Sequence, residues 1–228
     1  ITIHHMLTHS SGLPDYDGVS SDMSANGFTK FKRLHFTNEA YVDYISNIQP
    51  IAIPDQRFYY SNFAYHLLCI ILEGLYQQPF QDLLQEKICQ PLNLKNTYSS
   101  TENEAVAKKL AIGYNLDEST NEWRQNNFID LTLGRRIFST AEDLFNWARA
   151  MNDDRIFSNK SLEIMQQNHL SEITENISYG YGWAVIEPGS QSGMGNMNID
   201  MPYIIHGGST EGYKSILVKI DGGRSIVS

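Results

Sequence analysis

The sequence has little that would point to nucleic acid, to a membrane-spanning helix or to a disulfide framework. It carries 17 Lys and Arg against 26 Asp and Glu, a formal charge of -9 spread along the chain, which argues against nucleic acid as a partner. No apolar run approaches the roughly 20 residues that a membrane-spanning helix needs, and no signal region opens the chain. The only cysteines are Cys69 and Cys89, and we expect both to be buried thiols.

The composition that is present suffices for a globular domain. Hydrophobic residues make up 41% and aromatic residues 11% of 228 residues, which is enough to bury a core. The chain begins at Ile1 and ends at Ser228 within a strand-like stretch, so we expect both ends to be cut. The prediction is one incomplete domain over 1–228, mainly helical over 1–177 and with antiparallel strands over 178–228.

Helical spacing dominates the first part of the chain. The clearest case is the apolar stripe at Ala64, Leu67, Leu68, Ile71 and Leu75, which predicts a helix over 61–76. Ser139-Thr140-Ala141-Glu142 has the form of a capping box and predicts a helix behind it. The other predicted helices are a short one after Thr2 that Ser11-Gly12 ends, one over 37–48, one over 80–88 that ends before Pro91, and one over 158–168. The stretches 17–30 and 92–136 are expected to be loops.

Strand patterns dominate the end of the chain. Alternation predicts strands over 179–186, 202–206 and 213–220, and Asp221-Gly222-Gly223 predicts a hairpin turn into 225–227. Because helices come first and antiparallel strands follow, the predicted class is α+β.

Four stretches carry a family resemblance, in a consistent order. They are Thr2 to Leu13 (TIHHMLTHSSGL), Phe58 to Asn62 (FYYSN), Phe138 to Leu144 (FSTAEDL), and His206 to Tyr213 (HGGSTEGY). Together they resemble the serine β-lactamase, penicillin-binding protein and related esterase family. The resemblance implies a β-lactamase/transpeptidase-like fold, in which an antiparallel sheet is flanked by helices and a helical subdomain.

The resemblance also implies roles for five residues. Tyr60 corresponds to a general base, Asn62 to a group that bonds the substrate or a catalytic lysine, and His206 to a side chain that holds the charge state of the tyrosine. Gly208 would let the substrate backbone lie close to its strand, and Ser209 would donate its backbone N–H to an oxyanion hole. Two plainer alternatives remain open, a packing aromatic for Tyr60 and an ordinary histidine at a strand end for His206.

The nucleophile is not in this sequence. In the family, a Ser-x-x-Lys motif upstream of the stretch that matches 2–13 supplies it, and no Ser in this chain has Lys three residues later. The residues given are therefore expected to perform no covalent chemistry alone. The implied function of the complete protein is a serine acyl hydrolase acting through an acyl-enzyme on an ester, a D-amino-acid peptide or a lactam, as an esterase, carboxypeptidase or β-lactamase-like enzyme.

His206-Gly207-Gly208 stands where dedicated β-lactamases have Lys-Thr-Gly, which argues against efficient β-lactam hydrolysis. The alternative function is a non-catalytic penicillin- or peptidoglycan-binding homologue that serves as a regulatory module. The family habit implies a periplasmic or extracellular location, with any membrane association only through missing ends.

No cofactor or metal is predicted. His5 and His9 are four residues apart and adjacent to His4, but no acidic third ligand or Glu base accompanies them. The loop methionines are interpreted as packing rather than as copper ligands; they are Met194, Met197 and Met201.

Overall fold

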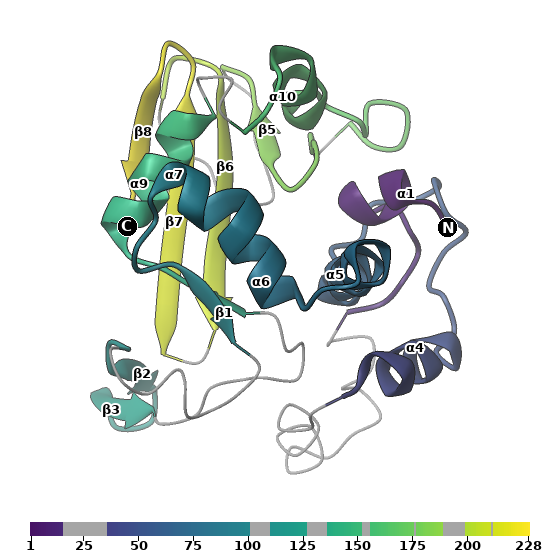
Figure 1. Ribbon diagram of the computed structural model, residues 1–228, viewed down its shortest axis with the longest axis horizontal. Coiled ribbons are helices and arrows are strands. Elements are labelled where there is room, and N and C mark those ends of the chain that lie inside the picture. Colours follow the sequence, from purple (N-terminus) through teal and green to yellow (C-terminus); the bar gives the residue numbers. More distant parts are fainter. Residues whose placement is uncertain are drawn as a thin grey trace.

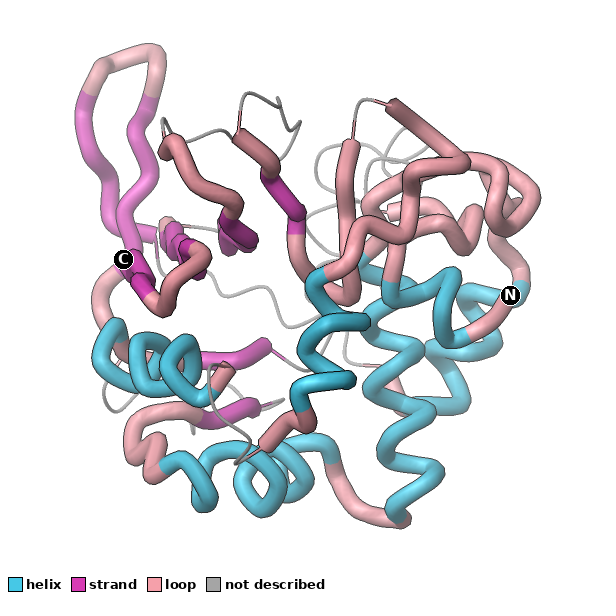
Figure 2. The backbone as a smooth tube through the Cα atoms, turned by 90° about the horizontal axis from the view of Figure 1, so that it is seen from above, coloured by secondary structure: helices cyan, strands magenta, loops and turns pink. Residues whose placement is uncertain are grey.

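The protein places a helical group beside an antiparallel sheet. The structure is a computed structural model of residues 1–228, and it describes residues 1–15, 36–100, 110–126, 136–151, 156–175, 177–188, 199–210 and 212–228. Figure 1 shows α1, α4 and α5 on the side of the N-terminus and the strands β5 to β8 on the side of the C-terminus. In the view from above, the strands lie on the side of the C-terminus together with further helices (Figure 2). The predicted α+β class is confirmed.

Side-chain caps begin the helices of the N-terminal group. Thr2 accepts a hydrogen bond from the His5 backbone at the start of α1 (Ile3–Leu7), Thr37 caps α4 (Asn38–Ser46), and Ser61 caps α5 (Asn62–Tyr76). Ile71 and Leu75, at the end of the predicted stripe of α5, are 43% and 72% exposed instead of buried. The earlier part of the stripe, Ala64, Leu67 and Leu68, packs with the other two helices around one buried cluster. Its buried members are Met6, Leu13, Tyr41, Ile45, Phe63 and Ala64.

The first helix ends earlier than predicted. It stops at Thr8, not at Ser11-Gly12, because His9 takes the left-handed conformation with φ 56°. The Ser10 N–H then bonds the His5 carbonyl at 2.9 Å and the His9 N–H bonds the Met6 carbonyl at 3.4 Å. This pair of bonds is a Schellman motif, in which glycine is the usual residue.

The helix predicted over 80–88 continues through Pro91 instead of ending before it. α6 (Phe80–Leu84) leads into a π-helical turn, η1 (Gln85–Cys89), and then into α7 (Gln90–Leu92). In this turn the Gln90 N–H bonds the Gln85 carbonyl, five residues back. The wider turn changes the hydrogen-bond register just before Pro91, so a residue without an N–H is tolerated there.

A buried carboxylate connects α9 (Ala141–Ala150) to the segment before the strand β1 (Tyr98–Ser100). Asp143 is 4% exposed and accepts hydrogen bonds from the Asn96 backbone at 2.7 Å and the Thr97 hydroxyl at 2.8 Å. The cap of this helix is Thr140, whose hydroxyl accepts from the Asp143 N–H at 3.2 Å. The predicted capping box was therefore one residue out of register. α10 (Asn159–Gln166) follows, capped by Ser158.

The main sheet has the order β5-β6-β7-β8 and is antiparallel throughout. Its strands are β5 (Ala184–Ile186), β6 (Tyr203–Thr210), β7 (Tyr213–Ile220) and β8 (Arg224–Val227). Alternation gives it two apolar faces. Ile204 and Leu217 pack with Ala148 and Met151 of α9, whereas Tyr203, Ile205, Val218 and Ile220 form a cluster with Leu170 and Tyr179.

Three strands and the start of a fourth lie in the stretch 92–136, which is predicted to be irregular, and they form two small sheets. β1 pairs with β4 (Arg136–Phe138), and β2 (Gly113–Asp117) forms a hairpin with β3 (Glu122–Asn126). The hairpin is missed because it is mostly exposed, so its burial pattern gives no signal, and because its strands are rich in polar residues. The predicted loop 17–30 lies outside the described residues.

One of the two cysteines is less buried than predicted. Neither cysteine forms a disulfide, and Cys89 is buried as predicted. Cys69 is only partly buried because it shares the outward side of α5 with Leu72 and Tyr76, three and seven residues further on.

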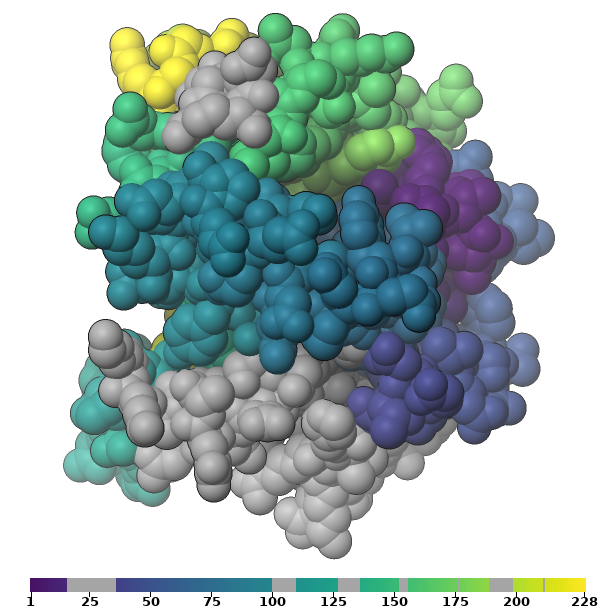
Figure 3. Space-filling view, viewed as in Figure 1, coloured from purple at the N-terminus to yellow at the C-terminus, as the bar shows by residue number. Residues whose placement is uncertain are grey.

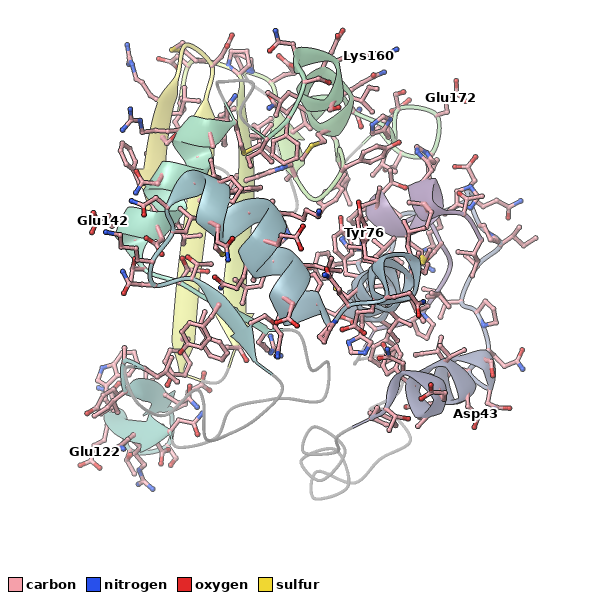
Figure 4. All side chains as sticks on the ribbon, viewed as in Figure 1. Asp43, Tyr76, Glu122, Glu142, Lys160 and Glu172 are labelled. Carbon is pink, nitrogen blue, oxygen red and sulfur yellow. The ribbon has the colours of Figure 1, made fainter. Side chains whose placement is uncertain are left out.

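Several charged side chains lie at the outer edge of the molecule in the view of Figure 1. The space-filling view shows the residues of α6 and α7 as a band across the middle of the face drawn (Figure 3). The charged side chains labelled in Figure 4 lie around the periphery, namely Asp43, Glu122, Glu142, Lys160 and Glu172. Within the described ranges, no helix combines the length and the apolar character that crossing a bilayer requires.

Candidate active site

Tyr60 and His206 lie side by side, although 146 positions separate them in the sequence. Tyr60 ends the extended segment before α5, and His206 is in the middle of β6. Their ring centroids are 6.3 Å apart, with 35° between the ring planes. The two rings that the sequence singles out therefore meet between the helical group and the sheet.

Asn62 is held by a carboxylate of the loop after α1. The Asn62 backbone N–H donates to Asp15 Oδ1 and its side-chain amide donates to Asp15 Oδ2, both at 3.0 Å. Next to it, the Ser61 hydroxyl donates to the Pro14 carbonyl at 2.8 Å. Ser61, the N-cap residue of α5, and Asn62 thus attach the segment 60–62 to the loop 10–15 through three hydrogen bonds.

The imidazole ring of His9 packs against the ring of Tyr60. His9 is 1% exposed, and its ring centroid is 4.2 Å from that of Tyr60. Tyr65 and Tyr179 flank it on other sides, with centroids at 4.8 and 5.1 Å. The Tyr65 hydroxyl donates to the Leu7 carbonyl at 2.8 Å, and burial raises the pKa of both the Tyr65 and the Tyr179 phenols. These two tyrosines are therefore protonated packing partners.

The local electrostatics keep Tyr60 protonated. Burial raises the pKa of its phenol above 10.0, the charge of Asp15 raises it further, and that of Arg136 lowers it. Burial also lowers the pKa of His206 below 6.5, so its imidazole is neutral at pH 7. A phenolate at position 60 thus requires more positive charge than the described residues provide.

Beyond Ile205, the described residues leave one edge of the strand that carries His206 without a strand partner, and we call this its open edge. Among the described residues, β5 pairs with β6 only at Tyr203–Ile205, while β7 pairs with the whole of β6. Gly208 and Ser209 lie on the exposed part of β6, opposite Ser215 and Lys214. Gly208 is two residues from His206, about 7 Å along the strand and on the same face.

Comparison with known proteins then identifies the family. The model of the family described as Beta-lactamase matches residues 1–227. The chain belongs to this family. Among curated members of the family, penicillin-binding protein 4* of Bacillus subtilis (strain 168) is 25% identical over 243 aligned residues, which cover 100% of this chain and 50% of the relative. The chain therefore spans about half the length of this relative.

Solved structures share the fold of this chain. The octameric penicillin-binding protein homologue from Pyrococcus abyssi superposes with a TM-score of 0.76 at 24% identity, covering 100% of this chain and 50% of that one. The D-stereospecific amidohydrolase from a Streptomyces species gives a TM-score of 0.77 at 20% identity, covering 100% and 66%. The predicted β-lactamase/transpeptidase-like fold is confirmed.

The histidines considered as metal ligands have other partners. His5 Nδ1 accepts from the Thr2 backbone at 3.3 Å, His4 Nδ1 is 2.9 Å from the Tyr181 hydroxyl, and His9 packs on Tyr60. In the part of the chain that is described, no group of three or more His, Cys, Asp or Glu side chains is arranged to hold a metal ion. Met201 packs beside the sheet, whereas Met194 and Met197 lie outside the described residues.

Three neighbours of Tyr60 were not found from the sequence. The sequence indicates His9 only as a candidate metal ligand and does not indicate Asp15 or Arg136, whose charges act on Tyr60 only in the folded chain. The sequence does hold a signal for His9 and Asp15. Both lie in one motif, on either side of Ser10-Ser11-Gly12-Leu13-Pro14. For Arg136 the sequence has no such signal.

The buried His9 predicts a loss of stability in acid. Burial, and next the nearby His206, lower the pKa of His9 from 6.5 to about 3. Between these values the unfolded chain binds a proton that the folded one does not, so stability falls by about 1.4 kcal/mol per pH unit as the pH drops. Urea unfolding should show that the native protein loses about 2 kcal/mol more than His9→Asn between pH 7 and pH 5. Equal losses in both proteins would show that His9 titrates normally.

Proposed function

We propose that the complete protein is a serine acyl hydrolase of the beta-lactamase family, with Tyr60 as its general base. The observation that carries this proposal is the approach of the Tyr60 and His206 rings to 6.3 Å, beside the open edge of β6. The nucleophile in this proposal is the serine of a Ser-x-x-Lys segment, which these 228 residues do not contain.

The electrostatics of Tyr60 support a lysine partner. A phenol acts as a base only when it is ionised, which requires a positive charge close to it. Arg136 is the one described cation whose charge lowers the Tyr60 pKa, and burial and Asp15 oppose it. A lysine ammonium next to the serine would supply the charge that the described residues lack.

The chemistry proceeds in two steps with one base. As the serine Oγ attacks the acyl carbon, its proton passes to the Tyr60 phenolate, and then from Tyr60 to the leaving amine or alcohol, which departs. Water then attacks the acyl-enzyme ester, Tyr60 takes a proton from it, and the serine Oγ recovers that proton as the acid leaves. The Ser209 N–H and the N–H of the serine would bind the oxyanion in both steps.

The proposed substrates are esters and amides of D-amino acids, including short peptides. Gly208 and the open edge of β6 suit an extended acyl group that lies along the strand. A neutral His206 offers no fixed charge for a substrate carboxylate at pH 7, which argues against fast β-lactam turnover. The D-stereospecific activity named for the Streptomyces relative is in line with this class.

The test uses the complete protein with three probes: a fluorescent penicillin, p-nitrophenyl acetate and a D-phenylalanine p-nitroanilide. We expect turnover of the ester or the anilide, and slow covalent labelling by the penicillin at one serine. The matched control replaces the serine of Ser-x-x-Lys with alanine. Labelling without any turnover would favour the alternative, a penicillin-binding regulatory module, and a protein that neither labels nor turns over would disprove the enzyme.

We also propose that the protein acts outside the cytoplasmic membrane, in the periplasm or extracellularly. The support is the family habit alone, because such substrates are cell-wall components or occur in the medium. Fractionation of the native host with an antibody would find it outside the cytoplasm, and a cytoplasmic signal would refute this location.

A further inference from the structure

His9 makes contact with the residues on both sides of Tyr60. Its carbonyl accepts the Tyr59 N–H at 2.8 Å, and its ring nitrogen Nδ1 accepts the Ser61 N–H at 3.1 Å. Between these two bonds, the His9 ring lies 4.2 Å from the Tyr60 ring at 36°. One residue therefore fixes the backbone before and after Tyr60 and also packs on its side chain.

The backbone of His9 allows this arrangement. As the left-handed residue of the Schellman motif after α1, with φ 56°, it turns the chain so that its carbonyl and its ring both face the segment 59–61. The usual glycine at this position would supply the same turn but no ring and no second acceptor. The choice of histidine therefore has a reason beyond ending the helix.

The Ser61 bond also defines the protonation state of the ring. Because Nδ1 accepts a hydrogen bond, it carries no proton, and the neutral imidazole holds its proton on Nε2. The site is buried, with His9 1% exposed and Ser61 0% exposed. Loss of the acceptor would leave the Ser61 N–H buried without a partner, which strongly disfavours the observed path of the chain.

We infer that His9 is a positioning residue for Tyr60, which it holds in the orientation that faces His206. The inference rests on the proposed function for its effect on catalysis, but not for the hydrogen bond itself. His9 does not touch the reacting atoms and acts through the segment 59–61. A shift of about 1 Å in a catalytic group can lower a rate by about 100-fold.

Two variants separate the ring from the acceptor. His9→Phe keeps an aromatic ring but removes the acceptor, whereas His9→Asn keeps an acceptor oxygen close to the place of Nδ1 and tolerates a positive φ. The matched control is His66→Phe, since His66 is also buried, at 4% exposed, and its ring also packs on a tyrosine ring, that of Tyr41, with centroids 3.9 Å apart at 47°.

The kinetic arm measures the acylation of the complete protein by p-nitrophenyl acetate. We expect His9→Phe to lower kcat by about 100-fold with KM within about twofold, and His9→Asn to recover to within about tenfold of the native rate. The limb of the pH–rate profile that reports the base should move in His9→Phe and stay in the control. Equal loss in both His9 variants and in His66→Phe would show that His9 is only part of the core.

The second arm does not need activity. Hydrogen exchange of the Ser61 amide, followed by NMR, should be fast in His9→Phe and protected in the native protein, in His9→Asn and in His66→Phe. Slow exchange in His9→Phe would overturn the inference. Fast exchange in His9→Phe without any hydrolytic activity in the native protein would instead support the hydrogen bond from Ser61 to His9 and refute the proposed function.

Discussion

Replacing Tyr60 with phenylalanine should lower the rate of acylation of the complete protein by a factor of about 10² to 10⁴, the usual contribution of a general base. The substitution removes one hydroxyl and keeps the ring that packs 4.2 Å from His9. Folding should therefore be unchanged, as a circular dichroism melt would verify. The rate is measured as the burst of p-nitrophenol on mixing with p-nitrophenyl acetate.

The neighbouring tyrosine provides the control. Tyr59 is also half-buried, and the Arg57 guanidinium lies 5.8 Å from the centre of its ring, on the face of that ring. Its hydroxyl has no part in the proposed chemistry, so Tyr59→Phe should react within about twofold of the native protein. Near-normal acylation by Tyr60→Phe would remove Tyr60 from the base role.

Replacing Gly12 with alanine should lower the free energy of unfolding by about 2–5 kcal/mol. Gly12 has φ +76°, where an L side chain is strained, and an added Cβ would collide with the carbonyl oxygen of Ala52. The Gly12 carbonyl also accepts the Ile51 N–H at 2.9 Å. This loss is a large part of the roughly 5–15 kcal/mol that holds a domain together.

Gly74 is the matched control for this change. It lies inside α5, and a Cβ added there meets no atom within 4 Å. Gly74→Ala should raise the free energy of unfolding by about 0.5–1 kcal/mol, because alanine loses less backbone entropy in a helix. Urea titration of the two variants gives opposite signs if the account is right. A neutral Gly12→Ala would show that the loop 10–15 is not packed against 51–55.

The sequence predicts the local elements well because their signals are local. The stripe from Ala64 to Leu75 and the capping serine at 61 define α5, and the turn Asp221-Gly222-Gly223 connects β7 to β8 as expected. Two of the errors occur where one local rule overrides another. The π-helical turn lets the helix pass Pro91, and His9 ends α1 before Ser11-Gly12 can.

The site is only half predictable, for a physical reason. Motifs indicate Tyr60 and His206 individually, and the structure brings their rings together. The contacts that set their surroundings join residues far apart in sequence, such as the Ser61 N–H with His9, 52 residues earlier, and Asn62 with Asp15, 47 residues earlier. No periodicity or spacing in the sequence encodes such pairs. Only the folded structure shows that the ring of His9 packs against the ring of Tyr60.

The most demanding requirement of the proposed mechanism is a second positive charge close to the Tyr60 phenol. Because desolvation and the negative charge of Asp15 raise the pKa of this half-buried phenol, it stays protonated unless a second cation approaches it. A serine that carries a lysine three residues later would bring both the nucleophile and that cation to one place. This requirement predicts that a serine and a lysine outside these 228 residues lie close to the Tyr60 hydroxyl.

The most direct measurement is therefore a distance in a crystal structure of the complete protein after reaction with penicillin. The account predicts that the acylated serine Oγ lies within hydrogen-bond reach of the Tyr60 hydroxyl, at about 2.6–3.2 Å, with His206 on the other side of the phenol. An acylated residue that lies beyond the reach of Tyr60, on another face of the molecule, would contradict it.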